Sequence, residues 1–150
     1  MRFCSIASGS SGNCIYVGSE NTHVLVDTGI SGKKMEAGLN SLDLTGRDLD
    51  GILITHEHSD HIKGLGVISR KYGIPIYTTG GTVDAMVRTN ALGKIPDGIF
   101  HEIKEDEPFE IGDLTVNPFS IPHDAAQPVG YRLECDGHSV GIATDLGKYN

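Results

Sequence analysis

Short β-prone apolar runs open the chain, and clusters of Gly, Ser and Asn separate them. Strand-like runs bounded by turn residues predict a small meander or a series of hairpins. The predicted strands are Arg2–Ala7, Cys14–Val17 and Thr22–Val26.

The hydrophobic spacing then changes to that of a helix. Between residues 31 and 42, the apolar side chains Met35, Leu39 and Leu42 recur at helical intervals. The compact apolar run Gly51–Thr55 that follows is typical of a buried strand. This region therefore predicts a helix followed by a strand.

A second helix and another strand come next. The apolar residues of this helix recur on one face until the Gly-Ile-Pro run at 73–75 stops it. They are Ile62, Leu65, Ile68 and Tyr72. The run Ile76–Thr79 predicts the next strand, so that the segment forms a βαβ unit.

The remainder of the chain is mainly strand-like. Thr82 can cap a third helix that runs through Asn90, and a Pro/Gly-rich connection follows. The predicted strands after it are Phe100–Ile103, Phe109–Ile111, Leu114–Ile121, Val129–Glu134 and Ser139–Thr144. With no internal repeat, low-complexity tract or linker, the pattern predicts one layered α/β domain in which helices cover a mixed sheet.

Composition narrows the class of protein. The 150 residues are 38% hydrophobic and 21% charged, and no apolar stretch approaches the roughly 18 residues of a membrane span. Strand-like sequence follows Met1 too closely for a signal peptide, which makes the cytoplasm the expected location. Three widely spaced cysteines predict reduced thiols, most of them buried.

The net charge of −8 argues against broad electrostatic capture of nucleic acid. Two bound divalent ions would change the total to −8 + 4 = −4 and would place the positive charge at their own site. The overall sign of the charge therefore does not decide the substrate.

The candidate chemistry lies in Thr55–His61, between a predicted buried strand and an amphipathic helix. Three imidazoles and two carboxylates fall within six residues there. In an extended segment His56 and His58 project to the same side, while Asp60 and His61 lie where the next helix begins. Imidazole nitrogen and carboxylate oxygen are zinc ligands, so this loop can supply parts of two adjacent metal sites. The alternative is a polar turn in which Ser59 or Asp60 only caps that helix.

This run matches the H-x-H-x-D-H signature and thus resembles the metallo-β-lactamase superfamily. Further segments resemble the other motifs of the superfamily in the expected order. They are Val24–Gly29 for the first motif, Ile121–His123 for the third and Ile142–Asp145 for the fourth.

The resemblance implies a site for two divalent metal ions, zinc or manganese. The implied ligands are His56, His58 and His123 for one ion, Asp60 and His61 for the other, and Asp145 as the bridge between them. Asp60 would also orient the attacking group and act as the catalytic residue. Asp27 would support the histidine loop without binding metal directly. From its sequence context alone, Asp27 is equally well a turn-forming residue before Thr28 and Gly29.

The superfamily fold is a four-layer αββα sandwich of two similar halves. The present chain resembles its N-terminal half plus the start of the second, and a further histidine ligand from a later strand is missing. We therefore expect residues 1–150 to form a C-terminally incomplete metallo-β-lactamase-like domain. A sheet without its cover would invite association, which predicts a homodimer through the uncovered sheet.

The expected reaction is hydrolysis, because a pair of metal ions about 3.5–4 Å apart can hold a shared hydroxide and stabilise a phosphodiester in displacement. The segments Ser8–Asn13, His123–Ala125 and Pro128–Arg132 resemble the YycJ/WalJ-type branch, which is related to PhnP-like proteins. That resemblance implies a phosphodiester substrate, with 5'-3' DNA exonuclease activity leading. A thioester or lactam hydrolase and a catalytically incomplete metal-binding fragment are the alternatives.

Two weaker features of the sequence also have simpler explanations. The Gly/Ser-rich segment Ser8–Asn13 offers backbone N–H groups that suit a phosphate, but a flexible turn between strands explains it equally well. His23, His101 and His138 lack any metal-ligand context, and we expect them at the surface.

Overall fold

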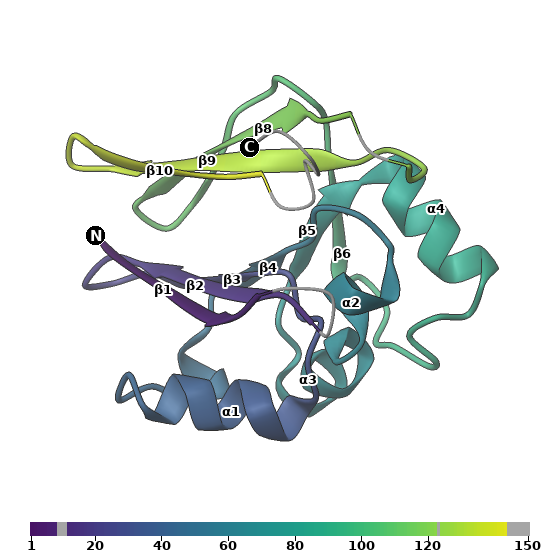
Figure 1. The fold of residues 1–150 in the computed structure, drawn as a ribbon, viewed down its shortest axis with the longest axis horizontal. Helices are drawn as coiled ribbons and strands as arrows, with labels where there is room; N and C mark the ends of the chain where they lie inside the picture. Colours follow the sequence, from purple (N-terminus) through teal and green to yellow (C-terminus); the bar gives the residue numbers. More distant parts are fainter. Residues whose placement is uncertain (9–11, 123, 144–150) are drawn as a thin grey trace.

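Two β-sheets lie face to face in the computed structural model, which describes residues 1–8, 12–122 and 124–143. Helices cover the outer face of the larger sheet (Figure 1). The layers are therefore helix, sheet and sheet. They correspond to three successive layers of the predicted αββα sandwich.

The larger sheet has six strands in sequence order. Its strands are β1 (Arg2–Ala7), β2 (Cys14–Gly18), β3 (His23–Val26), β4 (Gly51–Leu53), β5 (Ile76–Thr79) and β6 (Phe100–Ile103). The first three strands pair antiparallel, as a meander does, and β3 to β6 pair parallel. The mixed sheet that the sequence predicts is thus present.

Parallel neighbours need crossover connections, and helices supply them. The helical segments are α1 (Gly32–Asn40), the 3-10 turn η1 (Gly46–Asp48), α2 (Ser59–Ile62), α3 (Leu65–Tyr72) and α4 (Gly80–Arg88). Ser31 caps α1 by accepting a hydrogen bond from Lys34 N at 3.3 Å. Gly73, with φ 65°, ends α3 in the left-handed conformation that glycine adopts without strain.

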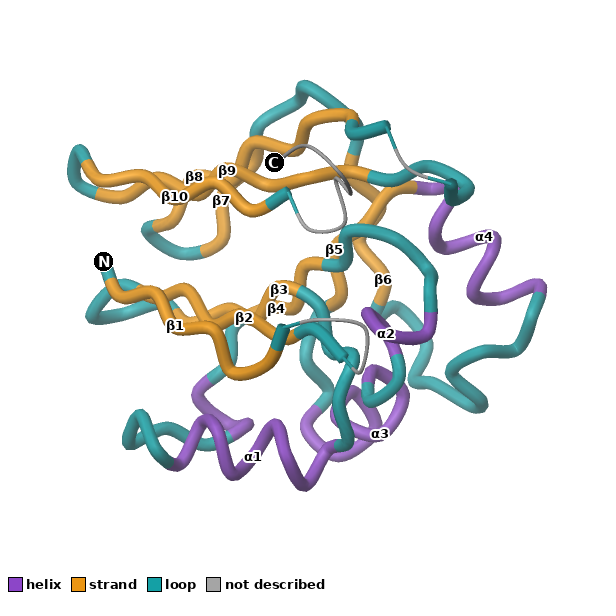
Figure 2. Tube along the Cα trace, in the orientation of Figure 1, coloured by secondary structure: helices purple, strands orange, loops and turns teal. Residues whose placement is uncertain are grey.

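The smaller sheet is antiparallel, in the order β10-β9-β8-β7. Its strands are β7 (Phe109–Ile111), β8 (Leu114–Ser120), β9 (Val129–Cys135) and β10 (His138–Ile142). Figure 2 shows its strands stacked over those of the larger sheet. The β-rich second half predicted from the sequence is confirmed.

Strand alternation divides the core into two layers. Leu25 of β3 packs with α1 residues such as Met35, whereas its neighbours Val24 and Val26 pack with Leu133 and other residues of the smaller sheet. Alternate side chains of a strand point to opposite faces, so one central strand serves both cores. The larger sheet is covered on both sides.

One predicted helix is divided in two. The periodicity predicts a continuous helix through Ile62 and Tyr72, but α2 ends at Ile62 and α3 begins at Leu65. Gly64 lies at the break, where its N–H donates to Thr28 O at 2.8 Å. A Cβ atom at Gly64 would lie 2.1 Å from Ile30 O, so the chain there requires glycine.

The helices, the cysteines and two of the histidines lie as follows. None of the helices in the described part of the chain is long and apolar enough to cross a membrane. All three cysteines are free; Cys14 and Cys135 are buried and Cys4 is half-buried. His101 and His138 are exposed as predicted.

His23 departs from the surface role predicted for it. The side chain is half-buried, and its Nδ1 lies 2.6 Å from the hydroxyl of buried Tyr16. Alternation along a strand could not reveal this partner, because Tyr16 belongs to the neighbouring strand β2.

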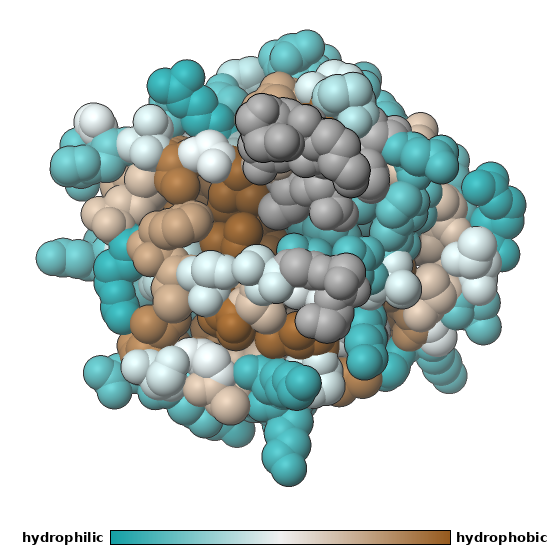
Figure 3. Space-filling view, in the orientation of Figure 1, coloured by the Kyte–Doolittle hydropathy of each residue, from teal (hydrophilic) through white to brown (hydrophobic). Residues whose placement is uncertain are grey.

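Apolar side chains are visible between the two sheets on the face where β1 and β10 are the outer strands (Figure 3). The exposed apolar residues include Phe3, which is 54% exposed. A single chain does not test the predicted homodimer, which stays a prediction.

Candidate metal centre

The histidine loop lies at the carboxyl end of β4 and leads into α2. His56 and His61 are fully buried, whereas His58 and Asp60 are half-buried. The His56 ring centroid lies 4.7 Å from that of His58 and 4.0 Å from that of His61. Folding thus brings three imidazoles together within one short loop.

Asp27 joins this loop to the end of β3. One carboxylate oxygen, Oδ1, accepts a hydrogen bond from Thr55 N at 2.8 Å. The other, Oδ2, accepts from the Thr55 hydroxyl at 2.8 Å and lies 2.5 Å from His61 Nδ1. The backbone of Asp27 has φ 64°, a conformation that Asp and Asn tolerate better than most residues.

These contacts favour particular tautomers for two histidines. With its Nδ1 against the Asp27 carboxylate, His61 carries the proton there and presents the lone pair of Nε2. The Thr55 hydroxyl, which donates to Asp27, lies 2.8 Å from His56 Nδ1 and can accept a hydrogen bond from an N–H group there. Both imidazoles then offer Nε2 as the nitrogen able to bind a metal.

Asn13 is a site residue that the sequence reasoning missed. Its side-chain Nδ2 lies 3.4 Å from Asp60 Oδ2 and 3.2 Å from His61 Nε2. The same nitrogen donates to Asp60 O at 3.2 Å. The signal lies in the Ser/Gly-rich segment Ser8–Asn13 before β2, which suggests a turn, a phosphate loop or a family resemblance but no contact with the metal ligands.

The loop before β9 is held against the histidine loop from the smaller sheet. Ala126 N donates to Glu57 Oε2 at 3.0 Å, and Val129 N donates to Thr55 O at 2.9 Å. Residues 124–128 are therefore fixed beside the histidine loop at two points.

Gln127 ties the same loop to the start of α4. Its backbone carbonyl accepts a hydrogen bond from the Thr79 hydroxyl at 2.8 Å. Its side-chain Oε1 accepts from Gly81 N at 2.9 Å, while Nε2 donates to Glu105 Oε1 at 3.0 Å. This last bond contributes most to holding the pKa of the Glu105 carboxyl below its ordinary value.

The buried side chain of Tyr131 connects the two sheets by reaching Ile54, which lies just before the histidine loop. The Tyr131 hydroxyl donates to Ile54 O at 2.7 Å, and the Thr78 hydroxyl donates to the same carbonyl at 2.9 Å. Burial raises the pKa of the Tyr131 phenol well above its ordinary value, so the hydroxyl keeps its proton. Thus Ile54 is held from the opposite sheet.

The structure describes some of the predicted ligands but not all of them. His123 and Asp145 lie outside the described residues. Within those residues, no group of three or more His, Cys, Asp or Glu side chains is arranged to hold a metal ion. Nevertheless, the His56 ring lies beside those of His58 and His61, and Asp60 Oδ2 lies 3.6 Å from His61 Nε2. This donor set suits a divalent ion such as zinc.

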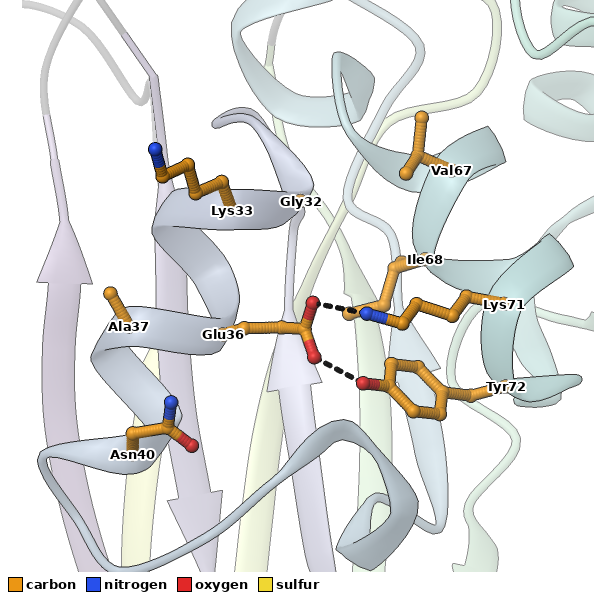
Figure 4. A pocket seen from close by; sticks show the side chains of 9 residues that line it. All are labelled: Gly32, Lys33, Glu36, Ala37, Asn40, Val67, Ile68, Lys71 and Tyr72. Carbon is orange, nitrogen blue, oxygen red and sulfur yellow. Dashed lines mark hydrogen bonds and ion pairs between the residues drawn. The ribbon is translucent and has the colours of Figure 1, made fainter.

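Another hollow, of about 490 Å³, lies between α1 and α3 and contains none of the predicted ligands. Glu36 extends into it from α1 and meets Lys71 and Tyr72 of α3 (Figure 4). The Lys71 Nζ lies 2.8 Å from Glu36 Oε2. These contacts link two helices, and the candidate chemistry stays with the histidine loop.

Comparison with known proteins agrees with the geometry. Residues 22–150 match the profile of a family described as "Beta-lactamase superfamily domain". Over 147 residues the chain is 42% identical to "Exodeoxyribonuclease YycJ" of Bacillus anthracis, covering 98% of this chain and 55% of that protein. Over 146 residues it is 41% identical to "Exodeoxyribonuclease WalJ" of Streptococcus pneumoniae, covering 97% and 54%. The chain thus spans about half the length of these curated relatives.

Solved structures show the same fold at low sequence identity. A metallo-β-lactamase variant from Cronobacter sakazakii superposes with a TM-score of 0.78 at 18% identity, covering 93% of this chain and 59% of that one. The Rm3 metallo-β-lactamase gives a TM-score of 0.75 at 21% identity, covering 93% and 56%. The fold predicted from the motifs is confirmed. Since the family profile spans most of the sequence, the chain belongs to the β-lactamase superfamily domain family.

Proposed function

We propose that this chain carries the metal-binding part of a hydrolase that cleaves phosphodiesters. The proposed substrate is DNA, and the proposed activity is that of a 5'-3' exonuclease. The observation that carries the proposal is the histidine loop, in which His61 is held by Asp27 at 2.5 Å beside His56 and His58. The curated relatives named exodeoxyribonucleases support the choice of DNA.

The proposed ligands fall into two sets. His56, His58 and His123 would hold one divalent ion, Asp60 and His61 the other, and Asp145 would bridge them. Zinc or manganese bound there would supply Lewis-acid chemistry, polarising a phosphoryl oxygen and easing the deprotonation of water.

The residues of the chain contribute orientation and control of protons. Asp27 keeps the proton of His61 on Nδ1, and the Thr55 hydroxyl does the same for His56. Asp60 is half-buried at the edge of the loop, where its carboxylate can ligate an ion and orient water for attack on phosphorus. The complete burial of His56 and His61 keeps bulk water from their rings.

The net charge of −8 suits such a substrate only once cations are bound. The acidic protein as a whole repels a polyanion, but the bound metal ions attract its phosphates locally. Binding of DNA should accordingly depend on metal. We propose no membrane partner, and the cytoplasmic location stays a prediction.

The test is a substrate panel on the full chain loaded with zinc or manganese. It compares DNA labelled at the 5' or 3' end, a simple phosphodiester, a thioester and a β-lactam. We expect the labelled DNA to be shortened from its 5' end. Cleavage of only the thioester or the lactam would contradict the phosphodiester assignment, and metal uptake without any cleavage would support the inactive metal-binding alternative.

A matched pair of histidine variants links the activity to the loop. His58→Ala should remove one ion and abolish DNA cleavage. His101→Ala is the control, because His101 is exposed and stacks on Tyr77 with ring centroids 4.9 Å apart. Retained metal stoichiometry in His58→Ala, measured by mass spectrometry, would refute its role as a ligand.

A further inference from the structure

Asn13 places a carboxamide against both residues proposed for the second metal position. Its Nδ2 lies 3.4 Å from Asp60 Oδ2 and 3.2 Å from His61 Nε2. Asn13 is only 5% exposed, and this nitrogen also lies 3.2 Å from Asp60 O. A buried amide with several polar neighbours constrains the groups around it.

The backbone fixes where this amide can reach. Asn13 N donates to Asp60 O at 2.8 Å, and Gly29 N donates to Asn13 O at 2.8 Å. Three segments that are distant in sequence are therefore joined at Asn13. The side chain begins from a rigid point beside the histidine loop.

The His61 tautomer shows what the amide does there. Its Nδ1 proton faces Asp27, so the Nε2 lone pair accepts a hydrogen bond from Asn13 Nδ2. A divalent ion would use the same lone pair of His61 and the same carboxylate of Asp60. The Asn13 N–H groups thus point at acceptors that a cation would share.

We propose that Asn13 is a positioning residue for the second metal position. Its carboxamide keeps Asp60 and His61 directed toward one point before the ion arrives, and gives up His61 Nε2 when the ion binds. This inference rests on the proposed function, since it takes Asp60 and His61 as ligands. Because the Asn13 amide contacts both residues proposed for the second ion, we expect its substitution to act on that ion.

The test is a titration of the metal-free full chain with Co²⁺, followed by visible absorbance and by bound stoichiometry. Wild type should bind two ions in two steps. Asn13→Ala should leave the first step close to wild type and weaken the second by roughly 10–100-fold, the range for losing a residue that supports a ligand. Asn40→Ala, at the exposed end of α1, is the control and should match wild type.

Asn13→Asp is the second variant, and it decides the matter if Asn13→Ala does not fold. It keeps the size of the side chain but replaces the N–H groups with a carboxylate oxygen. The added negative charge should tighten the second step and shift the Co²⁺ absorption assigned to it. An unchanged second step in this variant would overturn the role of Asn13.

The remaining outcomes separate the two proposals. If wild type takes up two ions and Asn13→Ala does so with the same affinities, the positioning role is wrong and the metal centre stands. If Asn13→Ala weakens both steps equally and lowers the melting temperature, Asn13 supports the fold in general. That result would also overturn its role as a positioning residue. A wild-type chain that takes up no Co²⁺ would overturn the metal centre itself, and the role of Asn13 with it.

Discussion

Asp27 Oδ2 and His61 Nδ1 lie 2.5 Å apart, although 34 positions separate the two residues in the sequence. Both side chains are buried. The contact ties the end of β3 to the first turn of α2 and selects the His61 nitrogen that faces the proposed metal. It is therefore the natural place to test the proposed support of the site.

Asp27→Asn should lower metal affinity by about 10–100-fold while the chain stays folded. The amide tolerates the φ of 64°, but its N–H group can face His61 Nδ1 and reverse the favoured tautomer. Metal content after dialysis, alongside circular dichroism, measures the effect. Asp43→Asn is a matched control, because Asp43 is exposed and has φ 63°. Equal metal content in both variants would contradict the support role.

Gly29→Ala should destabilise the chain by about 1–3 kcal/mol or more, as overpacking does. Its Cβ would lie 1.7 Å from Asp60 O and 2.7 Å from Asn13 N, both of which are backbone atoms. Neither atom can move without separating the loops of the site. Urea denaturation gives the free energy of unfolding.

Gly141→Ala in β10 is the control for Gly29→Ala. Among the described residues, no atom lies within 4 Å of the Cβ it would gain, so its stability should stay within about 0.5 kcal/mol of wild type. If the two variants proved equally stable, the close approach at Gly29 would have no energetic consequence.

Tyr131→Phe should reduce the free energy of unfolding by about 0.5–1.5 kcal/mol. The variant loses the donor to Ile54 O, but the Thr78 hydroxyl still reaches that carbonyl at 2.9 Å. The double variant with Thr78→Val should cost more than the sum of the single changes, because the buried carbonyl then loses both donors. Strict additivity in urea denaturation would argue against this shared role.

Glu36 predicts a dependence of stability on pH. Hydrogen bonds from Lys71 first and Tyr72 second hold the pKa of the Glu36 carboxyl below its ordinary value of 4.5. A lowered pKa means that the stabilisation is present above pH 4.5 and is lost as the pH falls through the lowered value. The difference in unfolding free energy between wild type and Glu36→Gln should therefore shrink between pH 7 and pH 3.

Lys71→Ala provides the control for this pH dependence. In that background Glu36→Gln should show a smaller difference at neutral pH, since the strongest partner of the carboxylate is gone. Thermal melts across the pH range measure both pairs. A difference that keeps its size at pH 3 would show that the ionised carboxylate is not its source.

Gln127→Ala should remove the side-chain tie between the loop before β9 and α4, while the bond from the Thr79 hydroxyl to the backbone carbonyl of residue 127 remains. The Gly81 amide would lose its acceptor, which lies 2.9 Å away in wild type, and its hydrogen exchange should accelerate. Gln127→Glu retains an oxygen at that position and should protect Gly81 while weakening the contact with Glu105. If Gly81 exchanges at the wild-type rate in Gln127→Ala, the side chain does not anchor the loop.

Local spacing predicted most of the elements, because hydrophobic periodicity is a property of neighbouring residues. The division of the second helix was not predicted, although Gly64 lay within it as a sign. Its cause is the approach of Ile30 O, which belongs to a separate loop. Only the folded chain shows that this carbonyl occupies the space of a side chain.

In the candidate site, too, a local motif identifies some residues, while others are found only through contacts between distant parts of the sequence. His56, His58, Asp60 and His61 could be identified because they form one contiguous motif. Asn13 could not, since 48 positions separate it from His61. The supporting role of Asp27 came from a family resemblance, because Thr55 and His61, which its carboxylate contacts, lie 28 and 34 positions further along the chain.

The bond from Tyr131 to Ile54 spans 77 positions and has a consequence for synthesis on the ribosome. The histidine loop emerges well before the strand that braces it, so during translation it is exposed without its counterpart from the other sheet. Contacts of such long sequence separation form late, because the chain must first close a large loop. The growing polypeptide would thus present its histidines to cellular metal ions before the bond from Tyr131 that braces their loop can form.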